Sequence, residues 1–282
     1  MFGLTLFSFA LAIVIGISLY LKSIPILQIH SLGSLLTENS WHPMKGQFGF
    51  FPFIMGTLWV TGIAILIAFP VCFLSGIFIS EYAHPWIKRV SYPLIDILSG
   101  IPPVIYGVWG ILVVVPFISD KLAPHFVQYS TGYCVLAGGI VLSIMIMPLI
   151  ISILFEILNS VPDELREASL SLGATTWQTI KFVILRKSLP GIIAAIVLAI
   201  SRAFGETIAV LMVCGNIPLV PHSVFDAGYP LPALIANNYG EMLTVPRYES
   251  ALMLAALILF VIILTFNTTS RIILIHIERR FA

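Results

Sequence analysis

Six long apolar runs divide this chain, and shorter polar stretches separate them. The runs cover approximately residues 3–21, 53–79, 93–118, 132–155, 191–214 and 250–269. A helix needs about 20 residues to cross a hydrocarbon core of about 30 Å, and each run approaches or exceeds that length. The apolar residues do not alternate with polar ones as barrel strands require. We therefore predict an all-α, polytopic transmembrane helical bundle of about six spans.

The composition agrees with a membrane-embedded chain. Of the 282 residues, 59% are hydrophobic and 10% are charged, against about 25% charged in soluble proteins. The net charge of +1 indicates no nucleic-acid partner, and no Cys/His cluster indicates a metal site. Three cysteines lie in or beside apolar runs, which predicts buried thiols rather than disulfides. We expect a single transmembrane domain over residues 1–282 that is surrounded by membrane lipid.

The distribution of Lys and Arg predicts the orientation. With the N-terminus inside, the inner segments carry nine of the 14 basic residues and the outer segments carry four, while Arg202 lies within a span. This asymmetry follows the positive-inside rule, so both termini are expected to face the cytoplasm. The first run lacks a basic leader and a cleavage site, which predicts a retained helix rather than a signal peptide.

Small and polar residues within the runs predict local features. Pro102 and Pro103 remove backbone donors in the third run and predict a break or kink, which either lines a cavity or serves packing. Asp96 is expected to be a solvated carboxylate near the inner end of that run. Three glycines would allow helices to approach closely: Gly138, Gly139 and Gly205.

A polar stretch, residues 156–190, interrupts the apolar pattern between the fourth and fifth runs. Ser160 before a proline and two acidic residues is typical of a helix start, so we predict a helix over about 163–171. Gly173 can adopt left-handed backbone at its end. A second helix is predicted over about 177–185. The resulting hairpin is either an ordinary connector or, as its exposed Trp and mixed charges favour, a docking surface.

Two charged residues lie deep in the fifth run. Arg202 is near its midpoint and Glu206 follows four residues later. A charge at this depth costs about 2.5–3.5 kcal/mol on insertion scales. On one continuous helix the two side chains share a face and can meet. They form either a self-neutralised pair that stabilises the bundle or, as we favour, a polar face on a translocation path that Ser201 and Thr207 would extend.

The polar stretch resembles the E-A-A…G…I-x-L-P loop of ABC importer permeases. The matching residues are Glu167, Ala168, Ser169 in place of the second alanine, Gly173 six positions after the glutamate, and Val183 with Leu185. Arg186 stands where the motif has its proline. In that family the loop carries a coupling helix that sits in a groove of a cytoplasmic ATPase.

Other stretches narrow the resemblance to phosphate importer permeases. Residues 201–210, SRAFGETIAV, are similar to that family's G-R-A-x-G-E-T-M-A-V stretch. EYAH, LSGIPPVIYGVWGILVVVPF and LPALIANNYGE are similar to its PstC type of subunit. The resemblance implies a type I, MetI-like permease fold and a multi-pass protein of the bacterial inner membrane. It also implies that residues 156–190 are the cytoplasmic coupling loop.

The resemblance further implies the partners and the substrate. They are a second, PstA-like permease, a PstB-like ATPase dimer that holds ATP and Mg²⁺, and a PstS-like extracytoplasmic phosphate-binding protein. The chain itself would bind no cofactor and catalyse no reaction. Its Arg202, Glu206, Thr207 and Ser201 would line the substrate path, where a guanidinium binds an oxyanion without losing its proton.

Other functions compete with an ATP-driven phosphate permease. One alternative is a permease for another oxyanion. Another is an ion-coupled secondary transporter using Arg202, Glu206 and Asp96, which would predict internal repeats, and the two halves show no clear one. An intramembrane enzyme would need a catalytic pair within the spans, and none stands out. The chain has no G-x-x-x-x-G-K-[ST] motif, which is consistent with ATP hydrolysis on a partner.

Overall fold

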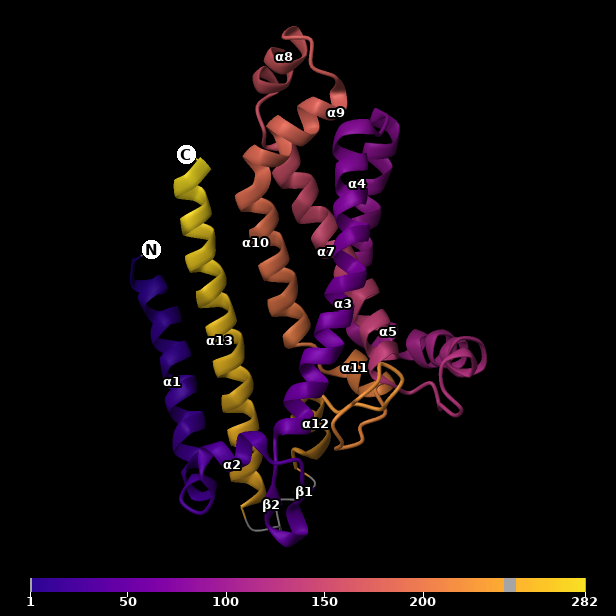
Figure 1. Ribbon diagram of the computed structural model, residues 1–282. Coiled ribbons are helices and arrows are strands. Elements are labelled where there is room, and N and C mark those ends of the chain that lie inside the picture. Colours follow the sequence, from indigo (N-terminus) through magenta and orange to yellow (C-terminus); the bar gives the residue numbers. More distant parts are fainter. Residues whose placement is uncertain (1, 241–246, 282) are drawn as a thin grey trace.

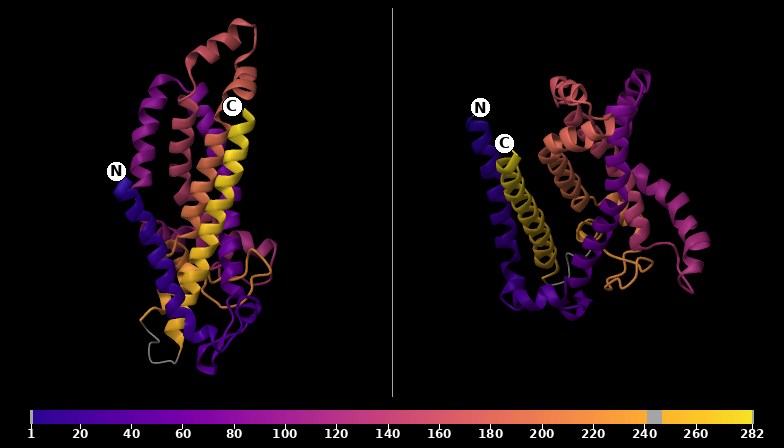
Figure 2. Two further views of the ribbon diagram at one scale, coloured as in Figure 1. Left: turned by 90° about the vertical axis from the view of Figure 1, so that its left-hand side faces the viewer. Right: turned by 45° about the horizontal axis from the view of Figure 1, so that its top comes forward.

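The computed structural model describes residues 2–240 and 247–281 and shows an elongated helical bundle (Figures 1 and 2). Residues 1, 241–246 and 282 lie outside this description, among them Glu241 of the LPALIANNYGE stretch. The principal helices are α1 (Phe2–Leu27), α3 (Phe51–Ile77), α4 (Pro85–Ser99), α5 (Pro103–Trp109), α7 (Val135–Asn159), α8 (Asp163–Ser171), α9 (Thr176–Thr179), α10 (Leu185–Phe204), α11 (Ile208–Val213), α12 (Leu231–Asn238) and α13 (Tyr248–Phe281).

Short elements complete the chain, and several are π-helical turns that continue a longer helix. The π turns are η2 (Phe78–Tyr82), η3 (Gly110–Val114), η4 (Ile118–Leu122) and η6 (Ile180–Ile184). The other short elements are α2 (Leu32–Thr37), β1 (Trp41–His42), η1 (Pro43–Lys45), β2 (Gln47–Phe48), α6 (Val115–Phe117) and η5 (Ala123–His125).

The described residues contain six helices long and apolar enough to cross a membrane, which agrees with the predicted number. They cover residues 10–27, 51–82, 103–125, 135–159, 176–204 and 248–275. The first, second, fourth and sixth overlap the predicted runs closely. The third and fifth differ in their bounds, and each difference has a backbone cause.

The predicted third run is wrong as a single span. The helix ends at Ser99, and the membrane-length helix begins only at Pro103, because Pro102 and Pro103 lack the backbone donors that would continue α4. The predicted break is thus confirmed. Helix α4 contacts α7 but none of its residues is buried, and Asp96 on it is exposed, as expected for a solvated carboxylate.

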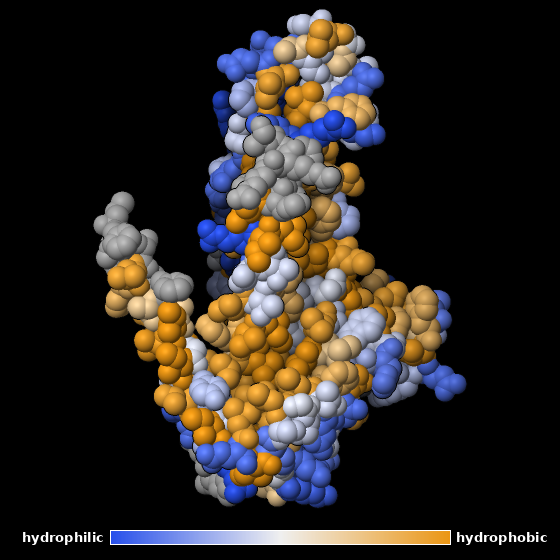
Figure 3. Space-filling model, turned by 60° about the vertical axis from the view of Figure 1, so that its left-hand side comes forward, coloured by the Kyte–Doolittle hydropathy of each residue, from blue (hydrophilic) through white to orange (hydrophobic). Residues whose placement is uncertain are grey.

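The two ends of the bundle differ. Helix α8 lies at one end, and α1 begins and α13 ends on the same side of the molecule (Figure 1). The opposite end holds α2, the β1–β2 hairpin and α12. Apolar side chains cover the middle, and polar ones gather toward both ends (Figure 3). This arrangement is the one that a bilayer would require.

The core is formed where α3 lies against α7, and glycines allow the close approach. A Cβ added to Gly139 would lie 2.4 Å from Ile63 Cγ2, and one added to Gly138 would lie 2.2 Å from Cys214 Sγ. The predicted packing role is confirmed at these two positions. It is wrong at Gly205, which is exposed and meets only carbonyls of its own helix. All three cysteines are buried and free, as predicted.

A small hairpin departs from the all-α prediction. Strands β1 and β2 pair antiparallel, with Trp41 opposite Phe48. The Trp41 ring packs edge-on against Phe53, with centroids 4.9 Å apart, and also contacts Phe50 and Tyr248. Aromatic burial of this kind explains why so short a hairpin is ordered, because it joins α3 to the start of α13.

Candidate functional site

Helix α8 forms over the predicted residues. It spans Asp163–Ser171, and its first turn carries two acidic residues that interact favourably with the positive end of the helix dipole. The predicted role of Ser160 as a cap is wrong, since its hydroxyl donates to the carbonyl of Ile157 (2.8 Å) at the end of α7. Gly173 has φ +83°, so its predicted left-handed conformation is confirmed.

The second half of the hairpin is not a separate helix. Thr175 and Gln178 form a reciprocal capping box at the start of α9, and the helix then runs through η6 and α10 to Phe204. The predicted short helix over 177–185 is therefore the first part of the fifth span. Arg186 lies within this helix, because its backbone N–H continues the hydrogen bonding that a proline would interrupt.

One departure from the E-A-A motif has a structural explanation. The Ser169 hydroxyl lies 2.9 Å from the hydroxyl of Thr179, a buried residue at the end of α9. An alanine at position 169 would lack this hydrogen bond. Ser169 therefore joins α8 to the helix that leads into the membrane.

The outer surface of the hairpin is exposed and partly apolar. Glu167, Ala168 and Gly173 are all exposed, and Ser169 is half-buried. Leu172 is 89% exposed in the turn after α8, and Trp177 is 53% exposed in α9, both near the polar end of the bundle. Exposed large apolar side chains at a polar end are typical of a protein-docking surface.

An arginine that the sequence analysis did not single out anchors α8. Arg166 Nη1 lies 2.6 Å from Glu81 Oε2, and Arg166 Nη2 donates to the carbonyl of Leu158 (2.9 Å). Arg166 Nε also lies 3.4 Å from Asp163 Oδ1. The sequence has a cation, Arg166, in the polar stretch of residues 156–190 and a carboxylate, Glu81, at the end of the second span. No sequence pattern relates one to the other.

The structure does not bring Arg202 and Glu206 together. Helix α10 ends at Phe204 with Gly205 as its C-cap, so the two side chains are not on one continuous helix. Among the described residues, no ion pair joins them. The predicted shared helical face is therefore wrong. Glu206 Oε1 instead accepts from the backbone N–H of Ala209 (3.3 Å) at the start of α11.

Arg202 is exposed and lies in the last turn of α10, just before the break that separates the fifth membrane-length helix from the apolar helix α11. It follows Lys187, the last basic residue before it, by about 22 Å of helix. Within the described part of the chain, its guanidinium forms no ion pair or side-chain hydrogen bond. An unpaired charge on a membrane-length helix is costly if it faces lipid, so Arg202 is expected to face water, a ligand or another protein.

The hydroxyls next to Arg202 bond locally. Ser201 Oγ donates to the carbonyl of Val197 (2.9 Å) and lies 2.5 Å from Asn267 Oδ1 on α13. Thr207 Oγ1 donates to the carbonyl of Gly205 (3.3 Å). An open groove of about 560 Å³ adjoins Ser201 between α10 and α13, and its lining includes Asn267 and Arg271.

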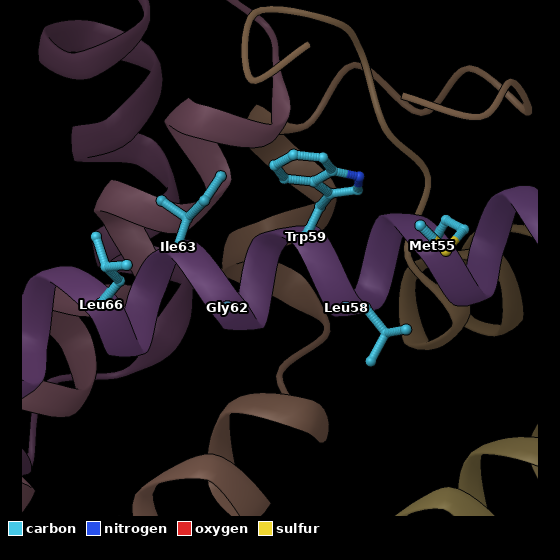
Figure 4. A pocket seen from close by; sticks show the side chains of 6 residues that line it. All are labelled: Met55, Leu58, Trp59, Gly62, Ile63 and Leu66. Atoms are coloured by element: carbon cyan, nitrogen blue, oxygen red, sulfur yellow. The ribbon is translucent and has the colours of Figure 1, made fainter. Parts of the chain in front are cut away.

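Another groove is unsuited to an anion. It lies along α3, has a volume of about 370 Å³ and is lined by Met55, Leu58, Trp59, Gly62, Ile63 and Leu66 (Figure 4). None of these side chains carries a charge. This groove therefore offers no charged contact to an anion.

Comparison with known proteins decides the family. Residues 72–282 match the model of the binding-protein-dependent transport system inner membrane component family. The chain belongs to this family. As a member of this permease family, it is a multi-pass component of an inner membrane and a subunit of a transport system.

Relatives of this permease include named phosphate permeases. It is 34% identical to the phosphate transport system permease protein PstC of Haemophilus influenzae, over 88% of this chain and 82% of that protein. It is also 34% identical to a probable PstC of Methanocaldococcus jannaschii, over 88% and 83% of the two chains. A probable ABC transporter permease of Bacillus subtilis, YqgH, is 44% identical over 73% of this chain and 66% of its own length.

Solved ABC importers share the fold of this permease. A chain of the inward-facing MetNI methionine transporter superposes with a TM-score of 0.59 at 20% identity, over 81% of this chain and 94% of that one. A chain of a bacterial alginate transporter gives 0.62 at 18% identity, over 94% and 87%. The predicted MetI-like permease fold is confirmed. These similarities do not favour a secondary transporter or an intramembrane enzyme.

Proposed function

We propose that this chain is the permease subunit of an ATP-driven importer for inorganic phosphate. The observation that carries the proposal is the exposed Arg202 in the last turn of α10, which has no ion-pair partner among the described residues. Relatives named as phosphate permeases, 33–34% identical over 88% of the chain, support the choice of anion.

Arg202 provides the anion contact. Its planar guanidinium offers parallel N–H donors to two oxygens of one phosphate and stays charged at every working pH. Because Glu206 does not neutralise it, release of the anion depends on movement of the helices rather than on a competing carboxylate. Glu206 instead holds the start of α11 and so maintains the break that follows Arg202. Ser201 and Thr207 flank the same path.

Residues 156–190 dock on a partner ATPase within the single permease domain of residues 1–282. Glu167, Ala168, Ser169 and Gly173 lie on or beside the exposed face of α8 that would enter the partner's groove. This assignment makes the α8 end cytoplasmic, together with both termini. ATP and Mg²⁺ then bind the PstB-like ATPase dimer, a PstA-like permease completes the path, and a PstS-like protein delivers phosphate outside.

The test measures phosphate uptake by the complete transporter in proteoliposomes. Arg202→Gln is expected to lower uptake about 100-fold, equivalent to about 2.7 kcal/mol for the loss of a bidentate charged contact. The complex should still assemble with its ATPase. The matched control is Arg89→Gln, since Arg89 is an exposed arginine on α4 away from the path, and it should keep normal uptake.

Two outcomes would contradict the proposal. Uptake that continues without any ATPase partner would exclude an ATP-driven importer. Normal uptake by Arg202→Gln would remove Arg202 from the path. Competition by sulfate as strong as that by phosphate would instead favour the alternative of a permease for another oxyanion.

A further inference from the structure

We infer that Arg166 is a positioning residue that clamps α8 to the ends of α3 and α7, so that these three helices move as one body. The inference rests on the proposed docking of α8 on an ATPase. The clamp adds a second route for the movement beside the covalent connections of α8. Through this contact, force applied to α8 passes directly into α3, although the two helices are far apart in sequence.

The guanidinium of Arg166 contacts three different elements at once. It reaches Glu81 on η2 at the end of α3 (2.6 Å), the Leu158 carbonyl at the end of α7 (2.9 Å) and Asp163 on α8 itself (3.4 Å). The Leu158 carbonyl is among the last four of α7, which have no partner within the helix. Arg166 satisfies that acceptor and places a cation at the negative end of the α7 dipole.

Burial distinguishes this contact from an ordinary surface ion pair. The Glu81 side chain is 7% exposed and that of Arg166 is 19% exposed. The pair Lys22–Glu249 at the opposite end has a similar 3.1 Å separation, but its side chains are 59% and 53% exposed. Water screens the exposed pair and hardly reaches the buried one, so the Arg166–Glu81 contact resists separation far more strongly.

Neighbouring residues hold Glu81 in place. The hydroxyl of Ser80, a buried residue, donates to Glu81 Oε1 (3.0 Å) and lies 3.3 Å from Asn159 Oδ1 on α7. Lys88 Nζ on α4 donates to the Ser80 carbonyl. The π-helical turn η2 presents these acceptors, and such turns are frequent at functional sites. These hydrogen bonds therefore extend the clamp to the turn between α3 and α4.

The clamp gives α8 two separate connections to the bundle. Arg166 joins it to α3 and α7, which pack closely along the core through Gly138 and Gly139. Ser169 joins it through Thr179 to the helix that carries Arg202. A push on α8 is thus delivered to the core pair as well as to the path. Without the clamp, α8 would keep its covalent connections, the Ser169 bond and its packing against α9 and η6.

The experiment combines distance measurements with transport in the assembled importer. Spin labels are placed at Phe78→Cys on η2 and Glu164→Cys on α8, both exposed positions, while the three native thiols are buried. The distance between the labels should be narrowly distributed and unchanged by ATP. In the Glu81→Gln background the distribution should broaden at least about twofold, and phosphate uptake per ATP hydrolysed should fall about tenfold, within the usual range for a coupling interaction.

Two further variants test the cause. Arg166→Lys keeps the positive charge but loses the paired, planar N–H donors of the guanidinium. Its phosphate uptake per ATP hydrolysed should therefore lie between the values of the wild type and of Glu81→Gln. Glu81→Asp keeps the carboxylate and should recover part of the narrow distance distribution. Glu81→Gln should still purify as an assembled complex with unchanged helix content, which excludes simple misfolding as the cause of its effect. Lys22→Gln is the matched control for loss of an ion pair, and it should leave both measurements at the wild-type value.

The outcomes separate the clamp from the proposed function. A label distance that changes with ATP in the wild type, or wild-type coupling in Glu81→Gln, would overturn the clamp. Absence of phosphate uptake by the wild type would overturn the proposed function alone, because the label distances would still report whether α8 and α3 move together.

Discussion

Arg166 and Arg202 lie in neighbouring helical segments, yet their surroundings differ in every respect. Arg166 is mostly buried and contacts Glu81, Asp163 and the Leu158 carbonyl. Arg202 is exposed, and in the part of the chain that the structure describes its side chain has neither an ion-pair partner nor a hydrogen bond. Arg166 uses Nη1 and Nη2 as hydrogen-bond donors within its own chain, whereas Arg202 makes no such bond in the described residues.

The difference separates two uses of charge in a membrane protein. A buried, ion-paired arginine fixes the position of helices, and removing its partner leaves an uncompensated charge. An arginine without such a partner gains only a small interaction with the dipole of its own helix, so we expect its main use to lie outside the chain. The same substitution at the two positions should therefore have opposite consequences for stability and for transport.

The largest effect on stability is expected for Arg166→Gln. Breaking the buried contact with Glu81 should lower the free energy of unfolding by about 3–5 kcal/mol. Arg202→Gln should change it by less than about 0.5 kcal/mol. Denaturant or thermal unfolding of the purified complex in detergent measures both. Equal destabilisation by the two substitutions would show that Arg202 has a structural partner after all.

A smaller effect is expected for Ser169→Ala, which restores the residue usual in the E-A-A motif. Loss of the hydrogen bond to Thr179 should cost about 1 kcal/mol, because one neutral hydrogen bond contributes about that much. Thr179→Val is the complementary variant. A double-mutant cycle between the two positions should give a coupling energy near the single-variant cost, and a coupling energy of zero would show that the bond is not formed in solution.

The smallest effect is expected for Lys22→Gln. Its ion pair with Glu249 joins α1 to α13, but both side chains are more than half exposed. An exposed pair contributes at most about 1 kcal/mol, and salt screens it. Stability of this variant should equal that of the wild type at high salt. A loss as large as that of Arg166→Gln would show that burial does not explain the comparison.

The sequence predicts most of the fold because the bilayer imposes a simple rule on it. Lengths of apolar runs identify the six membrane-length helices, and Pro102 with Pro103 predicts the break before the third. Helix α8 and the left-handed Gly173 are likewise readable from local chemistry. Each of these features depends on residues that are close together in the chain.

The other features could not be predicted, because they depend on contacts between distant residues or on a residue type that can serve two structural roles. Glu81 and Arg166 are separated by 85 positions, so no periodicity relates them. Gly205 was interpreted as a packing glycine, but a glycine is also the commonest end of a helix, and here it ends α10 between Arg202 and Glu206. Pattern alone could not decide between these two roles.

A proline near the middle of the fifth span determines how a movement passes along this helix. Pro190 lacks the backbone N–H and divides the helix into two arms, residues 176–189 and 191–204, each about 21 Å long. The helix bends most easily at this point. A bend at Pro190 changes the angle between the two arms, so it can move the Arg202 end while the arm that carries Trp177 stays in place. Movement at the docking end reaches Arg202 in full only while the helix stays straight at Pro190.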